Sequence, residues 1–175
     1  ETLAAAGFVT LLGCTGESAS REQAVLGSLL EHGPGSVAAE LHDDLNLITG
    51  HDRSNVPGLF AWTPSGEKFP VRVPEGCYLM QVARQLEILT GGFFLAGPHE
   101  VVIQDDARTL DYIRTCVGQG LVPWRVSRTL FAHAASRCML EPIGPFNTAA
   151  ARKNYPPILA GDQVRAEIMA IGLVE

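Results

Sequence analysis

Between Ser36 and Ile143 the sequence is a succession of short apolar runs separated by turn residues. Runs of this kind predict β-strands, and Pro64-Ser65-Gly66 predicts a hairpin turn between two of them. Many short strands at regular spacing are typical of a jelly roll, so we expect a mainly β fold with flanking helices. The expected strands are Ser36–Thr49, Leu59–Thr63, Lys68–Val73, Cys77–Val82, His99–Ile103, Trp124–Ala132 and Cys138–Ile143, with a further candidate at Gly7–Cys14.

Three segments have helical rather than strand-like spacing. Ser20–Glu31 and Gly161–Leu173 carry apolar residues on one helical face, which predicts a helix before the strands and another at the C-terminal end. Residues 105–119 begin with candidate N-caps and end before glycine, so we expect a helix inserted between two strands.

His42 and Asp44 are separated by one residue in an expected strand. Successive strand side chains point to opposite faces, so the two should emerge on the same side. Two imidazoles and one carboxylate suit a divalent first-row metal and are typical of non-haem Fe(II) oxygenases. His99 is the best candidate for the second imidazole, because it follows a Gly-Pro turn and opens an apolar strand. The other three histidines lack that setting: His32 is in a Gly/Pro turn, His51 is in a polar loop, and His133 is at a strand end.

Arg125 and Ser127 share a face of another expected strand. A buried arginine is costly unless it meets an anion, and its planar guanidinium matches a carboxylate. The alternative is that Arg125 faces solvent or pairs with an acidic side chain.

The segments around these residues resemble the isopenicillin N synthase-like family of 2-oxoglutarate/Fe(II)-dependent dioxygenases. The resemblance extends from about His42 to Phe131 and keeps the family's order of motifs. The segments that carry it are His42–Thr49, Pro57–Phe60, Gly66–Val71, Pro74–Leu79 and His99–Val102.

The resemblance implies a double-stranded β-helix, which is a cupin-like jelly roll. It also implies that His42, Asp44 and His99 bind Fe(II) and that Arg125 with Ser127 binds the distal carboxylate of 2-oxoglutarate. Such an enzyme uses O2, releases succinate and CO2 and oxidises an organic substrate, typically by hydroxylation. Ascorbate would serve as a reductant.

The chain departs from the family pattern at three places. The expected helix at 105–119 separates the second histidine from Arg125 and Ser127. Val82-Ala83-Arg84 stands where the family usually has Gly-Asp. No tyrosine precedes His42, although relatives often use an upstream tyrosine to bind 2-oxoglutarate.

Substrate residues are only weakly marked. Asn46 shares the expected inward parity of His42 and Asp44, and Phe60 and Trp124 are aromatic residues in or beside strands, so these three are candidates for the substrate pocket. A hydrogen bond to a neighbouring strand is an equal alternative for Asn46, and ordinary core packing is the alternative for the aromatic residues.

Composition limits the class of protein. A net charge of −6 supplies no basic stripe for nucleic acid, and no apolar run is long enough to span a membrane. Four scattered cysteines form no Cys-x-x-Cys pair, so we expect reduced thiols. We therefore expect a cytoplasmic enzyme that acts on a small molecule, with no nucleic-acid or membrane partner.

We expect residues 1–175 to form one catalytic domain with its jelly-roll core at 36–143. Because only about forty residues precede His42, we also expect the chain to be a fragment or the ordered part of a longer chain. Two other functions fit the sequence: an iron oxidase of the same family that does not use 2-oxoglutarate, and a non-catalytic jelly-roll binding module.

Overall fold

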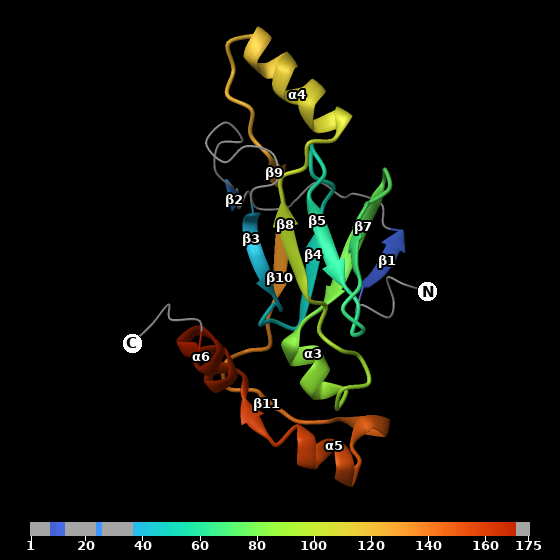
Figure 1. Cartoon of the computed structure of the whole chain (residues 1–175). Coiled ribbons are helices and arrows are strands. Elements are labelled where there is room, and N and C mark those ends of the chain that lie inside the picture. The colour runs from blue at the N-terminus through green and yellow to red at the C-terminus, as the bar shows by residue number, and fades with distance from the viewer. Residues whose placement is uncertain (1–7, 13–23, 26–36, 171–175) are drawn as a thin grey trace.

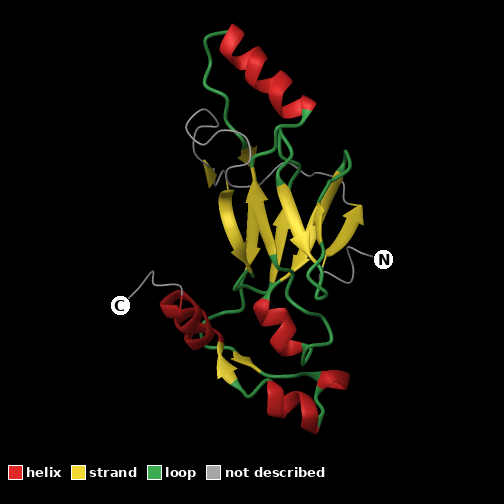
Figure 2. Ribbon diagram, in the orientation of Figure 1, coloured by secondary structure: helices red, strands yellow, loops and turns green. Residues whose placement is uncertain are grey.

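The computed structural model describes residues 8–12, 24–25 and 37–170, and two antiparallel four-stranded sheets make up its centre (Figures 1 and 2). The strand order of the first sheet is β1-β7-β4-β10, and that of the second is β3-β8-β5-β6. The first sheet contains β1 (Phe8–Leu12), β7 (Cys77–Val82), β4 (Ile48–His51) and β10 (Thr129–Ala132). The second contains β3 (Val37–His42), β8 (His99–Val102), β5 (Leu59–Trp62) and β6 (Lys68–Pro70).

The two sheets share a small apolar core. Ala61 of β5 and Leu79 of β7 are buried together with Val71, which follows β6. Burial alternates along most of β7, as expected of a strand that presents one face to a core. The β5–β6 hairpin is confirmed, and Gly66 in its turn has φ +83°, a conformation that glycine adopts without strain.

The expected strand at Ser36–Thr49 is wrong as a single element. Its first part is β3 and its last part begins β4, and the two belong to different sheets. The chain crosses between the sheets at residues 43–47, where backbone carbonyls bond to the start of a helix instead of a strand. Arg84 N donates to Asp44 O at 2.9 Å, and Gln85 N donates to Asn46 O at 2.9 Å. Satisfying these carbonyls outside a sheet stabilises the break in the strand.

The expected strand at Trp124–Ala132 is also divided. Val126–Ser127 forms β9, which pairs with β2 (Ala24–Val25), and Thr129–Ala132 forms β10 at the edge of the first sheet. The helix expected at Ser20–Glu31 is therefore wrong at Ala24–Val25, where strand pairing prevails over helical spacing; the rest of that segment lies outside the described residues.

The inserted helix is confirmed as α4 (Ala107–Gly118), which projects from one end of the sheets (Figure 1). The Asp106 carboxylate caps it by accepting from Arg108 N and Thr109 N. The C-terminal helix is confirmed as α6 (Ala160–Ala170), and residues 171–173 of the expected range lie outside the described residues.

Helices α3 (Arg84–Leu89), α5 (Ala149–Asn154) and α6 gather at the opposite end (Figure 1). Ile88 of α3 packs with Leu140 and Ala160 in a second apolar cluster. The remaining elements of this end are β11 (Met139–Leu140), which pairs with β12 (Ile158–Leu159), and a 3-10 turn at Gly144–Phe146. Of the helices in the described residues, none has the length and apolar character needed to cross a membrane.

Candidate metal and co-substrate site

The triad of His42, Asp44 and His99 comes together where β3 ends and β8 begins. His42 is the last residue of β3 and lies directly opposite His99, the first residue of β8, in the antiparallel pair. Asp44 follows in the crossing segment, so strand pairing and a turn, rather than the expected strand parity, bring it to the histidines. One ligand atom from each residue lies within 4.8 Å of the other two. His42 Nε2 is 3.7 Å and His99 Nε2 is 3.9 Å from Asp44 Oδ1.

The Asp44 carboxylate is held from behind by buried polar side chains. Thr49 Oγ1 donates to Asp44 Oδ2 at 2.6 Å. Asn46 Nδ2 donates to Thr49 Oγ1 at 3.0 Å and to Ile48 O at 2.7 Å. Asp44 Oδ2 is thus fixed by Thr49, while Oδ1 faces the two histidines.

His99 is almost fully buried, and this burial lowers its pKa to about 4. The imidazole is therefore neutral at pH 7, which a metal ligand requires. His99 Nδ1 lies 3.0 Å from Gly97 O. When Nδ1–H donates to this carbonyl, Nε2 keeps its lone pair on the side that faces Asp44.

Gln81 lies behind the triad, between two histidines. Its Nε2 donates to Gly97 O at 2.9 Å, the same carbonyl that lies 3.0 Å from His99 Nδ1, while its Oε1 lies 2.8 Å from His51 Nε2. Gln81 is fully buried, so these contacts fix its amide, which orients the His51 ring directly and contacts His99 through the shared Gly97 carbonyl.

The donor set fits iron. Two imidazoles and one carboxylate on one side of a metal leave positions open for further ligands, as in non-haem Fe(II) oxygenases. The side chain of His42 is 46% exposed, so the triad is reachable from outside although Asp44 and His99 are buried. The chain therefore contains a His-Asp-His triad able to bind Fe(II).

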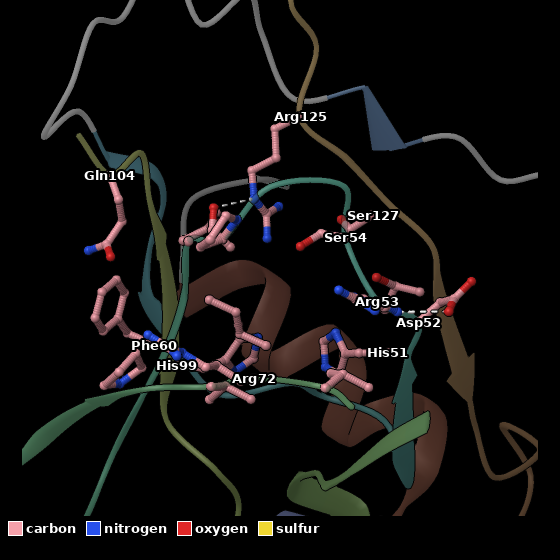
Figure 3. Close-up of a pocket in the computed structure, with 18 of the residues that line it drawn as sticks. His51, Asp52, Arg53, Ser54, Phe60, Arg72, His99, Gln104, Arg125 and Ser127 are labelled. Carbon is pink, nitrogen blue, oxygen red and sulfur yellow. Dashed lines mark hydrogen bonds between the residues drawn. The ribbon is translucent and has the colours of Figure 1, made fainter. Parts of the chain in front are cut away.

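A cavity of about 720 Å³ adjoins the triad and is lined from both sheets. Arg125, Ser127, Phe60 and His99 line it (Figure 3). His42 and Asp44 line it as well. Two segments that the strand pattern alone left far apart, the end of β3 and the segment after α4, thus share one space.

Arg125 is buried, and one of its nitrogen atoms has no hydrogen-bond partner among the described residues. It is 4% exposed, its Nη1 has no hydrogen-bond partner among the described residues, and its Nε donates to Pro57 O at 3.4 Å. Burial lowers the pKa of Arg125, because a guanidinium without an anion is poorly solvated here. Within the described part of the chain, the alternatives of a solvent-facing or acid-paired Arg125 do not hold. An unpartnered buried guanidinium fits the carboxylate of a bound ligand.

Two of the expected pocket residues do not line this cavity. Asn46 lies behind Asp44 and supports it, because the crossing segment turns its side chain toward Ile48 and Thr49. Trp124 is 38% exposed, and its carbonyl accepts hydrogen bonds from Tyr112 and Asn55 beside α4. Arg125 is the residue of that segment that is buried at the cavity, so its neighbour Trp124 remains outside.

His51 is a cavity residue that the sequence reasoning missed. It is not in a loop but ends β4, and its ring meets that of His99 edge-on at 5.8 Å between centroids. Burial lowers the pKa of His51, so this ring is also neutral at pH 7. The available signal was Thr49-Gly50-His51, whose alternation places Thr49 and His51 on one face of a strand.

Comparison with known proteins gives structural neighbours only. No protein-family model and no curated protein sequence matches the chain. A full-length protein of Neurospora crassa, solved in complex with alpha-KG, matches with a TM-score of 0.64 and 21% identity, over 82% of this chain and 40% of that one. A putative 2OG-Fe(II) oxygenase family protein from Caulobacter crescentus matches with a TM-score of 0.60 and 25% identity, over 76% and 40%.

A dioxygenase for auxin oxidation in rice also matches, with a TM-score of 0.62 and 20% identity, over 79% of this chain and 42% of that one. The chain thus spans about two fifths of the length of these neighbours. It has the fold of the 2-oxoglutarate/Fe(II) oxygenases, which confirms the recognition at that level. The narrower resemblance to isopenicillin N synthase-like members stays a prediction.

Proposed function

We propose that the chain is the catalytic domain of a 2-oxoglutarate-dependent Fe(II) dioxygenase that oxidises a small organic molecule. One observation carries the proposal: the buried, unpartnered guanidinium of Arg125 lines the same cavity as a His-Asp-His triad. Packing does not explain the Arg125 guanidinium, because its buried Nη1 has no hydrogen-bond partner among the described residues and the side chain lies next to an open space. A metal held by the triad and a dicarboxylate held by Arg125 would account for both features.

The jelly-roll assignment belongs to this proposal. Two antiparallel four-stranded sheets with a cavity between them are what a double-stranded β-helix requires. The structural neighbours support the proposed function, since the Neurospora crassa protein was solved with alpha-KG bound, and also with thymine or 5-formyluracil. Those ligands are of the small-molecule size that we propose for the substrate here.

Different residues of the chain would bind the metal and the co-substrate. His42, Asp44 and His99 would hold the iron, with Thr49 orienting Asp44 and the Gly97 carbonyl orienting His99. Arg125 would bind the distal carboxylate of 2-oxoglutarate, and Ser127 on the cavity wall would add a hydroxyl donor. With iron, 2-oxoglutarate and O2 bound, such a centre oxidises an organic substrate and releases succinate and CO2. The apolar walls would exclude water from it.

Succinate formation tests the proposal. We expect purified protein with Fe(II), ascorbate and 2-oxoglutarate to form succinate slowly even without a substrate, measured by mass spectrometry. His99→Ala should abolish both succinate formation and metal uptake. Arg125→Leu should keep the metal and raise the KM for 2-oxoglutarate at least about tenfold, since it removes a charged hydrogen-bonding partner.

Arg137→Gln is the matched control for the loss of a guanidinium, because Arg137 is exposed and lies outside the cavity. It should behave as the wild type. A wild-type protein that takes up iron but forms no succinate would overturn the 2-oxoglutarate assignment and leave an oxidase or a binding module.

A further inference from the structure

The cavity gathers positive charge in an acidic chain. Four arginines line it, Arg53, Arg72, Arg108 and Arg125, although the net charge of the sequence is −6. Within the described residues none of the four forms an ion pair with a carboxylate, whereas Lys68, Arg84 and Arg128 do. The four arginines thus differ from those three in having no anion from the described part of the chain to neutralise them.

Two of the four already have a partner in the proposed site or in the fold. Arg125 faces the co-substrate in the function proposed above. Arg108 donates from Nη2 to Asn55 O at 3.0 Å and follows the Asp106 carboxylate that caps α4. Arg53 and Arg72 remain. Among the described residues, the hydrogen bond that involves Arg53 comes from its backbone N–H, which donates to the Asp52 side chain.

In the proposed complex with metal and 2-oxoglutarate, the positive charges of Arg53 and Arg72 are not balanced by those two ligands. A divalent metal with the Asp44 carboxylate has a net charge of +1, and Arg125 adds another, which together balance the two carboxylates of 2-oxoglutarate. Asp52, which also lines the cavity, forms an ion pair with Arg128 at 3.1 Å. With Asp106 engaged at the start of α4, Glu75 is the remaining carboxylate of the lining among the described residues, and it lies exposed in the turn before β7. Arg53 and Arg72 are themselves exposed, and Glu75 neutralises at most one of them, so at least one of these two guanidinium groups is open to an anion in the cavity.

Much of the rest of the wall is apolar. Leu59, Val71, Val73 and Val101 line the cavity, as do the rings of Phe60 and Phe131. Figure 3 places Arg53 and Arg72 below Arg125 in the view, with His51 and His99. A molecule beside the metal would thus meet an apolar surface and, at a point separate from Arg125, a guanidinium.

We propose that the substrate is a small organic acid with an apolar body and a single carboxylate, and that Arg53 and Arg72 bind this carboxylate. The inference rests on the proposed function, because the excess charge is counted with the metal and 2-oxoglutarate in place. Arginine suits this role because its planar donors bind a carboxylate through two hydrogen bonds.

The test compares carboxylates with their neutral amides. Protein loaded with Co(II) and saturating 2-oxoglutarate is titrated in a calorimeter with phenylacetate, phenylacetamide, octanoate and octanamide. We expect at least one acid to bind about tenfold or more tightly than its amide, in keeping with a charge-assisted pair. The combined Arg53→Gln and Arg72→Gln variant should lose this preference, while the exposed control Arg137→Gln keeps it.

Affinity for 2-oxoglutarate is measured on the same proteins and separates the two proposals. It should be retained in the Arg53/Arg72 variant and lost in Arg125→Leu. If the preference for acids disappears only in Arg125→Leu, the acids merely occupy the 2-oxoglutarate site and the inference is overturned. Equal binding of acids and amides, or no binding of either, also overturns it.

If the wild-type protein does not bind 2-oxoglutarate, the proposed function fails. The acids are then titrated without it, and a preference that depends on Arg53 and Arg72 would still support the anion site. A melting curve by circular dichroism confirms that each variant is folded.

Discussion

Within the part of the chain that the structure describes, one hydroxyl orients the Asp44 carboxylate. Thr49 Oγ1 donates to Asp44 Oδ2, and both residues are buried, so no water replaces the bond readily. A hydrogen bond of this kind fixes a carboxylate so that its other oxygen points at the metal. The residue that the sequence places in the pocket, Asn46, acts one step further back by holding Thr49.

Thr49→Val should therefore weaken metal binding without emptying the cavity. Loss of a partner that orients a ligand typically costs about 10–100-fold in metal affinity, and we expect that range for Co(II) followed by its visible absorption. Thr109→Val is the control, because Thr109 is also buried and its hydroxyl contacts a carboxylate, that of Asp106, away from the triad. Equal Co(II) affinity in both variants would contradict the role of Thr49.

Gly58 gives Arg125 room to enter the cavity. Its φ is +146°, and a Cβ at this position would lie 2.8 Å from Val102 O and 3.1 Å from Arg125 Nε. A side chain here would meet both a strained backbone and the guanidinium group.

Gly58→Ala should lower the free energy of unfolding by about 1–3 kcal/mol and also weaken 2-oxoglutarate binding, because Arg125 must shift. Gly66→Ala separates the two effects. Gly66 also has a positive φ, +83°, but a Cβ there meets no atom within 4 Å. Its variant should lose stability in urea denaturation and keep its affinity for 2-oxoglutarate; a loss of affinity there as well would contradict the steric explanation.

Among the elements, helix α3 joins the sheets to the C-terminal segment through Glu87. This buried carboxylate accepts hydrogen bonds from Ala96 N at 2.7 Å and from Tyr155 at 3.0 Å, and it pairs with Arg84. Arg84, which departs from the family pattern, thus acts in this ion pair and not in the cavity.

Glu87→Ala should destabilise the fold by about 2–4 kcal/mol, because it leaves buried donors without an acceptor. Glu167→Gln is the control, since Glu167 is half-exposed and meets Arg84 at 3.7 Å, and it should cost less than about 1 kcal/mol. Urea denaturation measures both values. Similar losses in the two variants would show that Glu87 acts only as a surface charge.

For the molecule as a whole, the site exists only when both sheets are in place. The metal triad lies at the end of β3 and the start of β8, whereas Arg125 arrives after α4 and the cavity has walls from each sheet. The unfolded chain cannot assemble this arrangement, so ligands bind the folded state and stabilise it.

Metal and 2-oxoglutarate should therefore raise the melting temperature in two separable steps. At a concentration of 100 times its Kd, each ligand adds about 2.7 kcal/mol, which corresponds to roughly 5–10 °C for a chain of this size. Differential scanning fluorimetry with Co(II) alone, and then with 2-oxoglutarate, measures the steps. Arg125→Leu should keep the first step and lose the second, and loss of both or neither would contradict the division of roles.

The sequence by itself determined most strand positions, the inserted helix α4 and the identity of the residues that form the triad. These depend on local patterns: apolar runs between turns, an N-cap at Asp106, and residue types suited to a metal. Only the tertiary structure decided where the chain leaves a sheet, because the break at residues 43–47 is stabilised by hydrogen bonds to α3, about forty residues away.

Only the tertiary structure decided which residues line the cavity. Strand parity does not distinguish Asn46, which supports Asp44, from His51, which lines the wall, since both depend on where the strand is interrupted. Burial of Arg125 without a partner among the described residues likewise follows from the packing of distant segments around it. Local pattern therefore identified the metal-binding residues, and long-range packing decided which of the other polar residues face the ligands.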